Sequence, residues 1–320
     1  MSDRPSGAPQ AGGIPIRTIF LGSGGFGVPS LRRLAELPDV ELVGVVTAPA
    51  RKTGRRQELT SSPIDRTARA IGIDAILTPG RLRDQASIAS VLGLEPSLAV
   101  LADYGQIVPA EILDLPMGAL NLHPSLLPRY RGATPIPAAI LGGDDETGVT
   151  LILMDAGIDT GPIVATSRAA LDGTDTAPDL EARLQVQAAD LLATSIGPWL
   201  AGALVPRPQD SSKATLTRPL TREDGRLRAS NPARQLERHV RAYTPWPGSF
   251  VETPRGRLIV HAASVDDVAP GPVGTIDRVG LNTIDGRLAF RRVQAAGGRP
   301  MSWDEYLRGG PKVVGSSIVE

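Results

Sequence analysis

Residues Arg17-Thr-Ile-Phe-Leu-Gly-Ser-Gly-Gly-Phe-Gly27 open the part of the chain that decides its fold. The apolar stretch Arg17–Leu21 predicts a strand, and leucines at positions 31, 34 and 37 give the next segment a helical period. The glycines between them allow a tight turn, because glycine has no side chain to obstruct it. A strand, a glycine turn and a helix form the first unit of an α/β sheet.

The same alternation continues through the first two thirds of the chain. We expect further strands at 40–47, 74–77, 97–102, 119–122 and 149–154. Helical patterns separate them at 63–71, 83–92, 109–113 and 135–141, and a long helix at 176–200 closes the region. The sequence therefore predicts a Rossmann-like, doubly wound, mostly parallel α/β sheet, whose ligands bind beyond the carboxyl ends of the strands.

The pattern changes after residue 204. Residues 205–220 are polar and contain prolines, as linkers do. We expect one further helix, with Asn231 as its N-cap and Pro232 in its first position. Short strands at 257–265, 274–279 and 287–293 then predict a small OB-like β-barrel. The expected division is a disordered tail at 1–15, a first domain at 16–204, the linker, and a C-terminal domain at 221–320.

The composition excludes several classes of protein. Lys+Arg and Asp+Glu both number 34, so no overall charge draws the chain to nucleic acid. The chain has no cysteine and only three histidines, far apart in sequence, so we expect no metal site. It has no apolar stretch of membrane-spanning length, and residues 1–15 lack the pattern of a signal peptide. We expect a cytoplasmic protein.

The glycines at 22, 24 and 27 also match a dinucleotide-binding fingerprint. Such a site needs an acidic residue at the end of the second strand, and none occurs at 47–51. Arg51 could instead accept a 2′-phosphate, so an NADP-dependent oxidoreductase remains an alternative. The competing interpretation is close packing between strand and helix.

Two polar segments suggest chemistry. In Gly118–Gly132, Asn121 and His123 alternate at a strand end and therefore point to the same face. Asp155 and Asp159 lie on a glycine-rich loop after another strand, and an Asx-stabilised turn is the simpler interpretation of Asp155. An amide, an imidazole and a carboxylate brought together would suit acyl transfer, with Asn121 donating to an oxyanion.

The string NLHPSLLPRYRG at 121–132, followed by MDAGIDTG at 154–161, resembles the folate-dependent formyltransferases. Asn121, His123 and Asp159 match that family's catalytic residues. The resemblance implies that an amine attacks the formyl carbon of 10-formyltetrahydrofolate, without a metal. It also implies a folate pocket formed by two loops and the turn after His123, with contacts from Tyr104, Gly105, Gln106, Val108, Ser125, Leu126, Leu127, Pro128, Met154 and Ile158. Asp103 departs from the small or apolar residue expected there.

Three features of the chain resemble those of the family members that formylate methionine on initiator tRNA. The chain continues for about a hundred residues past the catalytic region, as the tRNA enzymes do. Val240–Gly248 resembles the signature that opens their tRNA-binding C-terminal domain. The basic stretch at 50–58 resembles the insertion that enters the acceptor stem, so Arg51, Lys52, Arg55 and Arg56 are expected tRNA contacts, with Arg55 reading the first base pair.

The expected partners are thus initiator methionyl-tRNA and the folate donor, with no membrane, for a monomeric enzyme. A sugar-nucleotide N-formyltransferase with the same donor is the main alternative. A hydrolase using Ser125 and a non-enzymatic RNA-binding module are further alternatives. Arg222, Arg226, Arg228, Arg255 and Arg257 could add RNA contacts from the C-terminal domain.

Overall fold

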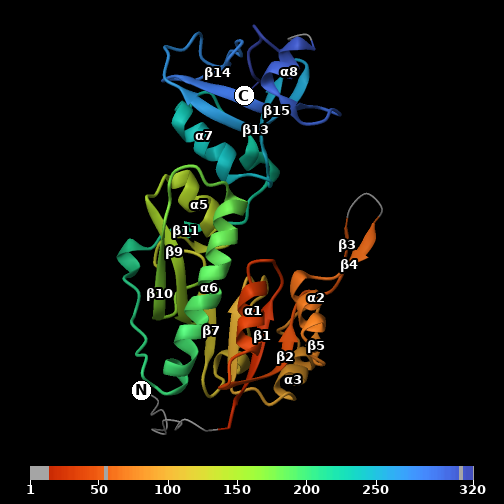
Figure 1. Ribbon diagram of the computed structural model, residues 1–320, viewed down its shortest axis with the longest axis vertical. Helices are drawn as coiled ribbons and strands as arrows, with labels where there is room; N and C mark the ends of the chain where they lie inside the picture. The colour runs from red at the N-terminus through yellow and green to blue at the C-terminus, as the bar shows by residue number, and fades with distance from the viewer. Residues whose placement is uncertain (1–13, 54–56, 310–312, 320) are drawn as a thin grey trace. The chain divides into compact units, whose positions relative to one another are not determined.

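The computed structural model describes residues 14–53, 57–309 and 313–319, which form two compact units (Figure 1). Unit 1 consists of Met1–Gly132, Thr147–Ala170 and Glu181–Leu216. Unit 2 consists of Ala133–Glu146, Leu171–Leu180 and Thr217–Glu320. Most of the tail expected at 1–15 lies outside the described residues. The domain limits expected from the sequence stay predictions.

Unit 1 is built on a seven-stranded sheet in the order β10-β9-β7-β6-β1-β2-β5. Parallel pairing runs from β5 to β7, whereas β9 is antiparallel to β7. The expected mostly parallel α/β sheet is therefore confirmed, although β10 was not expected. The strands are β1 (Ile16–Gly22), β2 (Val40–Val46), β5 (Ile76–Leu77), β6 (Leu98–Ala102), β7 (Ala119–His123), β9 (Glu146–Leu153) and β10 (Ile163–Ala170).

Side-chain alternation in the strands separates the two faces of this sheet. Ile19 and Leu21 of β1 pack in one buried cluster with Leu101 of β6 and Ala119 of β7. Residues of α3 and α4 complete that cluster. In Figure 1, α1 and α6 lie in front of the sheet. The helices of this region are α1 (Val28–Ala35), α2 (Pro63–Ala70), α3 (Gln85–Leu92), α4 (Ala110–Leu113) and α6 (Ala177–Leu200).

The glycine turn after β1 is explained by close packing. A side chain at Gly22 or Gly27 would bring its Cβ to 2.7 or 2.9 Å from the carbonyl oxygen of Ala102. Both distances are shorter than real Cβ contacts allow. The turn therefore needs glycine for the contact with β6, whether or not a nucleotide binds there.

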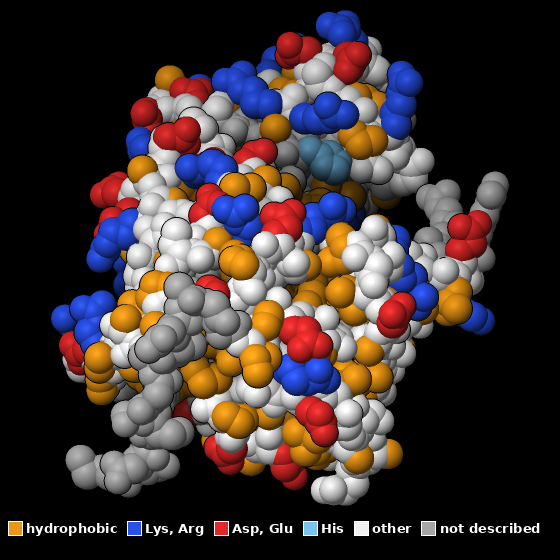
Figure 2. All heavy atoms as spheres, turned by 60° about the horizontal axis from the view of Figure 1, so that its bottom comes forward, with side chains coloured by type: hydrophobic (Ala, Val, Ile, Leu, Met, Phe, Trp, Pro, Cys, Tyr) orange, Lys and Arg blue, Asp and Glu red, His pale blue; other side chains and the backbone are white. Residues whose placement is uncertain are grey.

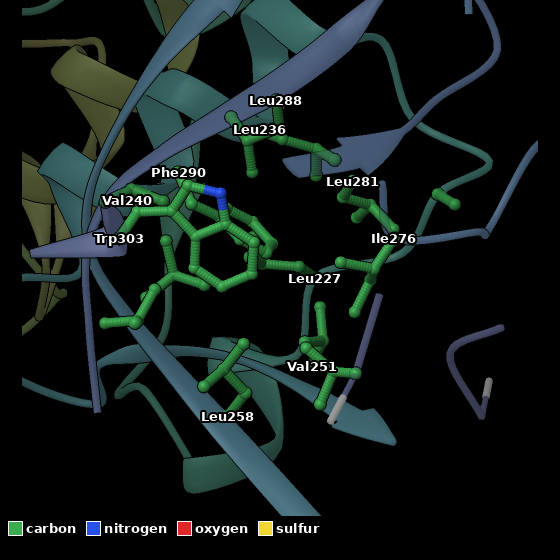
Figure 3. Packing of buried hydrophobic residues seen from close by; sticks show 14 residues of the cluster. Leu227, Leu236, Val240, Val251, Leu258, Ile276, Leu281, Leu288, Phe290 and Trp303 are labelled. Atoms are coloured by element: carbon green, nitrogen blue, oxygen red, sulfur yellow. The ribbon is translucent and has the colours of Figure 1, made fainter. Parts of the chain in front are cut away.

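Unit 2 contains an antiparallel sheet in the order β12-β13-β15-β14, with β16 paired to β15. Its core cluster includes Leu236 of α7, Phe290 of β15 and Trp303 of α8 (Figure 3). The elements are α5 (Pro135–Gly142), η2 (Arg222–Gly225), α7 (Ala233–Ala242), β12 (Ser249–Thr253), β13 (Gly256–Asp266), β14 (Gly280–Asn282), β15 (Arg287–Ala295), β16 (Met301–Ser302) and α8 (Trp303–Arg308). The expected β-rich C-terminal domain is present, and its OB-like closure stays a prediction.

Two expectations for unit 2 were wrong in detail. Helix α7 begins at Ala233, and Asn231 is not its N-cap. Asp285 replaces the cap from a distant part of the chain, because its carboxylate accepts the Ala233 N–H at 2.8 Å. The expected strand at 274–279 is reduced to isolated β-bridges at Thr275 and Ile276, followed by a turn into β14 in which the Asp277 carboxylate accepts two backbone N–H groups.

Candidate active site

Asn121 and His123 extend the apolar face of the sheet with polar groups. They alternate along β7 with the same parity as Ala119, which belongs to the buried cluster. Asn121 also lies beside Leu101 of that cluster in the parallel register of β6 and β7. Because paired residues of a sheet share a face, the amide and imidazole point to the side covered by α3 and α4.

The loop after β9 brings Asp159 to these two residues. Its carboxylate accepts a long hydrogen bond of 3.4 Å from the Asn121 amide. The other carboxylate oxygen lies 3.6 Å from Nδ1 of His123. Since β9 runs antiparallel to β7, the loop begins beside Ala119 and folds back across β7. The site therefore lies at the carboxyl end of β7, whose last residue is His123, and Asp159 reaches it because its loop folds back across this strand.

Asp159 adopts a left-handed backbone conformation, with φ of 52°. This conformation is unfavourable for a residue with a side chain, so surrounding contacts must hold it. The Gly132 N–H donates to its carboxylate at 2.8 Å, and the Gln209 amide donates to its carbonyl at 2.8 Å. Arg131 in turn donates to the Gln209 oxygen at 3.0 and 2.8 Å. These contacts fix where the carboxylate points.

Gln209 was missed by sequence reasoning because it lies in the segment expected to be a linker. That segment is ordered against unit 1: Arg207 pairs with Ile163, and the Arg131 N–H donates to the Thr215 carbonyl. The short elements here are β8 (Arg131–Gly132), η1 (Ser211–Lys213) and β11 (Leu216–Thr217). Nothing in the polar composition of 205–220 distinguishes Gln209 from a solvent-exposed linker residue.

The orientation of His123 defines its tautomer. The ring is only 5% exposed, and Nε2 lies 2.8 Å from the carbonyl oxygen of Tyr130. A carbonyl only accepts hydrogen bonds, so Nε2 carries the hydrogen. Nδ1, which faces Asp159, then carries a hydrogen only in the imidazolium form. The pair can therefore hold one shared proton beside Asn121.

Two other polar residues near the site have structural partners. Asp155 accepts from the Gly157 N–H at 3.0 Å and the Thr160 hydroxyl at 2.6 Å, which is the Asx-stabilised turn. Ser125 is fully buried and donates to the Arg129 carbonyl at 2.7 Å. Its hydroxyl is therefore engaged within the turn, which gives no support to Ser125 as a nucleophile, and its expected folate contact stays a prediction.

The two loops expected to hold the pterin share one core. Tyr104, Val108 and Met154 pack against the same buried cluster. Ile107 and Ile158, by contrast, are 74% and 70% exposed on these loops. These loops therefore leave two large apolar side chains accessible to a ligand. Ile107 was not among the expected contacts, because an isolated apolar residue in a loop gives no signal in the sequence.

The remaining residues of the first loop play different parts. The Gln106 side chain accepts from the Leu82 N–H at 2.7 Å and donates to the Pro79 carbonyl at 3.1 Å, so it ties two loops together. Gly105 faces open space. The Tyr104 hydroxyl is buried, and no partner for it occurs within the described residues. Burial raises the pKa of Tyr104 to about 12.

Asp103 explains the unusual glycines before α1. Its backbone turns into the left-handed region, with φ of 52°, and its carboxylate occupies the space where Gly24 would carry a side chain. The residue is exposed, but its carboxylate points back against the turn. There, desolvation first and the charge of Glu181 second raise the pKa of Asp103 to about 6. The Asp103 side chain therefore fits only because residue 24 is a glycine.

Leu126 and Leu127 line a separate hollow of about 470 Å³, together with Ile163, Arg168 and Arg207. Neither the Asn121 amide nor the Asp159 carboxylate lines this hollow. Pro128, half-buried in the same turn, follows them. Leu126 and Leu127 therefore line a different hollow from the region where Asn121, His123 and Asp159 meet.

The expected RNA contacts are only partly described. Arg51 and Lys52 are exposed on β3 (Arg51–Thr53), which pairs with β4 (Glu58–Thr60) in a hairpin beside α2 (Figure 1). Arg55 and Arg56 lie outside the described residues. On the face drawn in Figure 2, basic and acidic side chains are interspersed. RNA contact would therefore depend on local groups.

Other classes of site gain no support. Among the residues that the structure describes, no three His, Asp or Glu side chains are grouped to hold a metal. In the same part of the chain, no helix combines the length and apolarity needed to cross a membrane.

Comparisons with known proteins identify relatives over most of the chain. The formyl transferase family matches residues 17–196, and the formyl transferase C-terminal domain matches residues 219–311. A methionyl-tRNA formyltransferase of Roseiflexus sp. (strain RS-1) is 41% identical over 303 residues, covering 92% of this chain and 93% of its own.

Solved structures share the fold at lower identity. An N-formyltransferase from Helicobacter canadensis, in complex with folinic acid and dTDP-3-aminofucose, matches with a TM-score of 0.63 and 18% identity over 86% of this chain and 99% of its own. A methionyl-tRNA formyltransferase from Clostridium thermocellum matches with a TM-score of 0.53 and 19% identity over 79% of this chain and 95% of its own.

Proposed function

Because the chain belongs to the formyltransferase family over both its N-terminal and C-terminal parts, we propose that it formylates initiator methionyl-tRNA. The formyl group comes from 10-formyltetrahydrofolate and is transferred to the α-amino group of methionine. The relative at 41% identity over nearly the whole chain supports the tRNA substrate. The sugar-linked match has only 18% identity, which supports a common fold and not a common acceptor.

The meeting of Asn121, His123 and Asp159 carries this proposal. The Asn121 amide can donate to the formyl oxygen as that oxygen gains negative charge. His123 faces the same region through Nδ1 and can donate when protonated. Asp159 supplies a carboxylate whose position is fixed by the Gly132 N–H. An amide, an imidazole and a carboxylate around one point suit attack of an amine on an activated formyl group.

The reaction balances with these groups. The amine nitrogen forms a bond to the formyl carbon, and the carbonyl π electrons move to the oxygen, beside the Asn121 amide. Asp159 accepts the proton lost from the attacking nitrogen, directly or through water. When the carbonyl reforms, the bond from carbon to the folate nitrogen breaks, and imidazolium His123 gives that nitrogen a proton. The proton taken up by Asp159 can then return to Nδ1.

The loops at 104–108 and 154–159 form the proposed donor pocket. The exposed side chains of Ile107 and Ile158 provide apolar surface for a flat pterin ring. The exposed backbone of Gly105 offers polar contacts, whereas the Tyr104 hydroxyl is buried. We assign 16–204 as the catalytic domain and 221–320 as the tRNA-binding domain of a monomeric cytoplasmic enzyme.

A direct assay tests the proposed function. The purified chain, supplied with methionyl initiator tRNA and 10-formyltetrahydrofolate, is expected to yield formylmethionyl-tRNA, detected by mass spectrometry after release of the amino acid. A dTDP-linked amino sugar with the same donor should give no formylated product. Formylation of the sugar and not of the tRNA would contradict the proposal.

Arg51 and Lys52 on the β3–β4 hairpin are expected to contact phosphates of the acceptor stem. Each lost phosphate contact should reduce the slope of log affinity against log salt by about one. The double variant Arg51→Ala/Lys52→Ala should therefore bind tRNA more weakly and with a slope smaller by about two. Its KM for the folate donor should not change. A wild-type slope in the double variant would exclude this hairpin from RNA contact.

A further inference from the structure

The chain has three tryptophans, and only one of them is exposed. Trp199 and Trp303 are 2% and 4% exposed, and their indole N–H groups donate to the carbonyls of Met117 and Arg278. Trp246 is 52% exposed. Exposing a large aromatic ring forgoes the stabilisation that its burial would give. This ring therefore calls for an explanation outside the folding of unit 2.

Trp246 is presented by a fixed turn after α7. The Gly248 N–H donates to the Tyr243 carbonyl at 2.9 Å, and the Thr244 hydroxyl donates to the Val240 carbonyl at 2.7 Å. Gly225 of η2 lies so close to the Gly248 carbonyl that a side chain there would clash. These contacts hold the turn in place, so a ligand that covers the indole would order few additional groups on binding.

A cation accompanies the ring. The Arg222 guanidinium lies 5.8 Å from the Trp246 ring centroid. Its neighbours Arg218 and Arg226 are paired with Asp224 and Glu223. Arg222 forms no ion pair with any residue that the structure describes in this segment, so its charge is available to an anion.

We propose that Trp246 and Arg222 form a stacking platform for an unpaired base of the RNA substrate. The inference rests on the proposed function, because it takes methionyl-tRNA as the ligand. An unstacked base has an exposed π face that an indole can cover. The phosphate next to that base is negatively charged and can pair with the Arg222 guanidinium. Bases inside a duplex are already stacked and do not fit this surface.

Steady-state kinetics test the platform. Loss of one stacked base is expected to raise KM for tRNA about tenfold in Trp246→Ala, with unchanged kcat and unchanged KM for the donor. Trp246→Phe keeps a stacking ring and should stay within about threefold of wild type. Arg222→Ala should raise KM and lower its salt dependence, whereas Val268→Ala and Arg299→Ala, at other exposed positions of unit 2, should not. A wild-type KM in Trp246→Ala would overturn the proposal.

Fluorescence gives a readout that does not require turnover. Because the other two tryptophans are buried, base stacking should quench the indole emission of Trp246 on titration with tRNA. The quench should be absent in Trp246→Phe, and its persistence there would overturn the proposal. A tRNA without its single-stranded 3′ end shows which base stacks on Trp246. If the base belongs to the 3′ end, the quench is lost with this tRNA; if the base belongs to a loop, the quench remains. If wild type binds and quenches but does not formylate, the proposed function fails and the platform stands.

Discussion

His123→Ala is expected to lower kcat for formylation by about 10³-fold, with KM for both substrates close to wild type. The imidazole is nearly buried, and the Tyr130 carbonyl fixes its Nε2–H at 2.8 Å. Its other nitrogen faces the Asp159 carboxylate. Alanine removes both the hydrogen-bond donor to the developing oxyanion and the acid for the leaving nitrogen. Single-turnover formylation at saturating tRNA and donor measures the loss.

Two further variants keep this prediction testable if alanine disturbs folding. His123→Gln retains most of the volume and can still donate to the Tyr130 carbonyl, but it cannot become protonated to supply an acid. It should lose nearly as much activity while melting close to wild type. His261→Ala, which removes a histidine paired with Gln294 on unit 2, should remain active. Activity within tenfold of wild type in a folded His123 variant would rule out the assigned role.

The fold and the convergence of Asn121, His123 and Asp159 were predicted from different kinds of information in the sequence. Alternating apolar strands and helices fixed the class of the sheet, because periodicity reflects which face is buried. The parity of Asn121 and His123 along β7 followed from the two-residue repeat of a strand. The approach of Asp159, 36 residues beyond His123, had no such local basis. It came from the family resemblance.

What could not be predicted depends on tertiary contacts. Because β9 is antiparallel to β7, the Asp159 loop starts near the first residues of β7; after a parallel strand it would start near the last ones. No local pattern in the sequence distinguishes the two strand directions. Gln209 supports Asp159 from a segment whose composition is that of a linker. Asp285 replaces Asn231 at the start of α7. In each case the arrangement depends on a partner far away in sequence, which the local pattern does not specify.

Ser125 illustrates the same limit at the site. The family string places it in the turn after His123, where sequence reasoning assigned it to folate. In the structure, its hydroxyl donates to the Arg129 carbonyl, and its own carbonyl accepts from the Thr150 hydroxyl. Ser125 therefore shapes the turn that carries the Tyr130 carbonyl to His123. A motif thus identifies a functional segment without showing which of its side chains meet the ligand.

Asp159→Asn is expected to lower kcat by about 10³-fold at neutral pH. The substitution keeps the shape of the side chain but removes its charge and its capacity to accept a proton. If the new amide oxygen keeps the Gly132 N–H, its NH₂ group faces the Asn121 amide, so two donors oppose each other. Asp155→Asn is the matched control: it changes the same charge on the same loop, and its Oδ1 can still accept from Gly157 and Thr160.

The pH dependence separates proton acceptance from positioning in this variant. An unperturbed α-amino group has a pKa of about 7.7–8.0, and an aminoacyl ester should have a lower one. Raising the pH supplies neutral amine to both enzymes equally, but it also supplies hydroxide, which can take the proton of the attacking nitrogen in place of the carboxylate. The deficit of Asp159→Asn relative to wild type should therefore narrow between about pH 6.5 and 8.5 in single-turnover experiments. A deficit that stays constant over that range would contradict proton acceptance by Asp159, because the loss of a carboxylate that only positions other groups is not relieved by hydroxide.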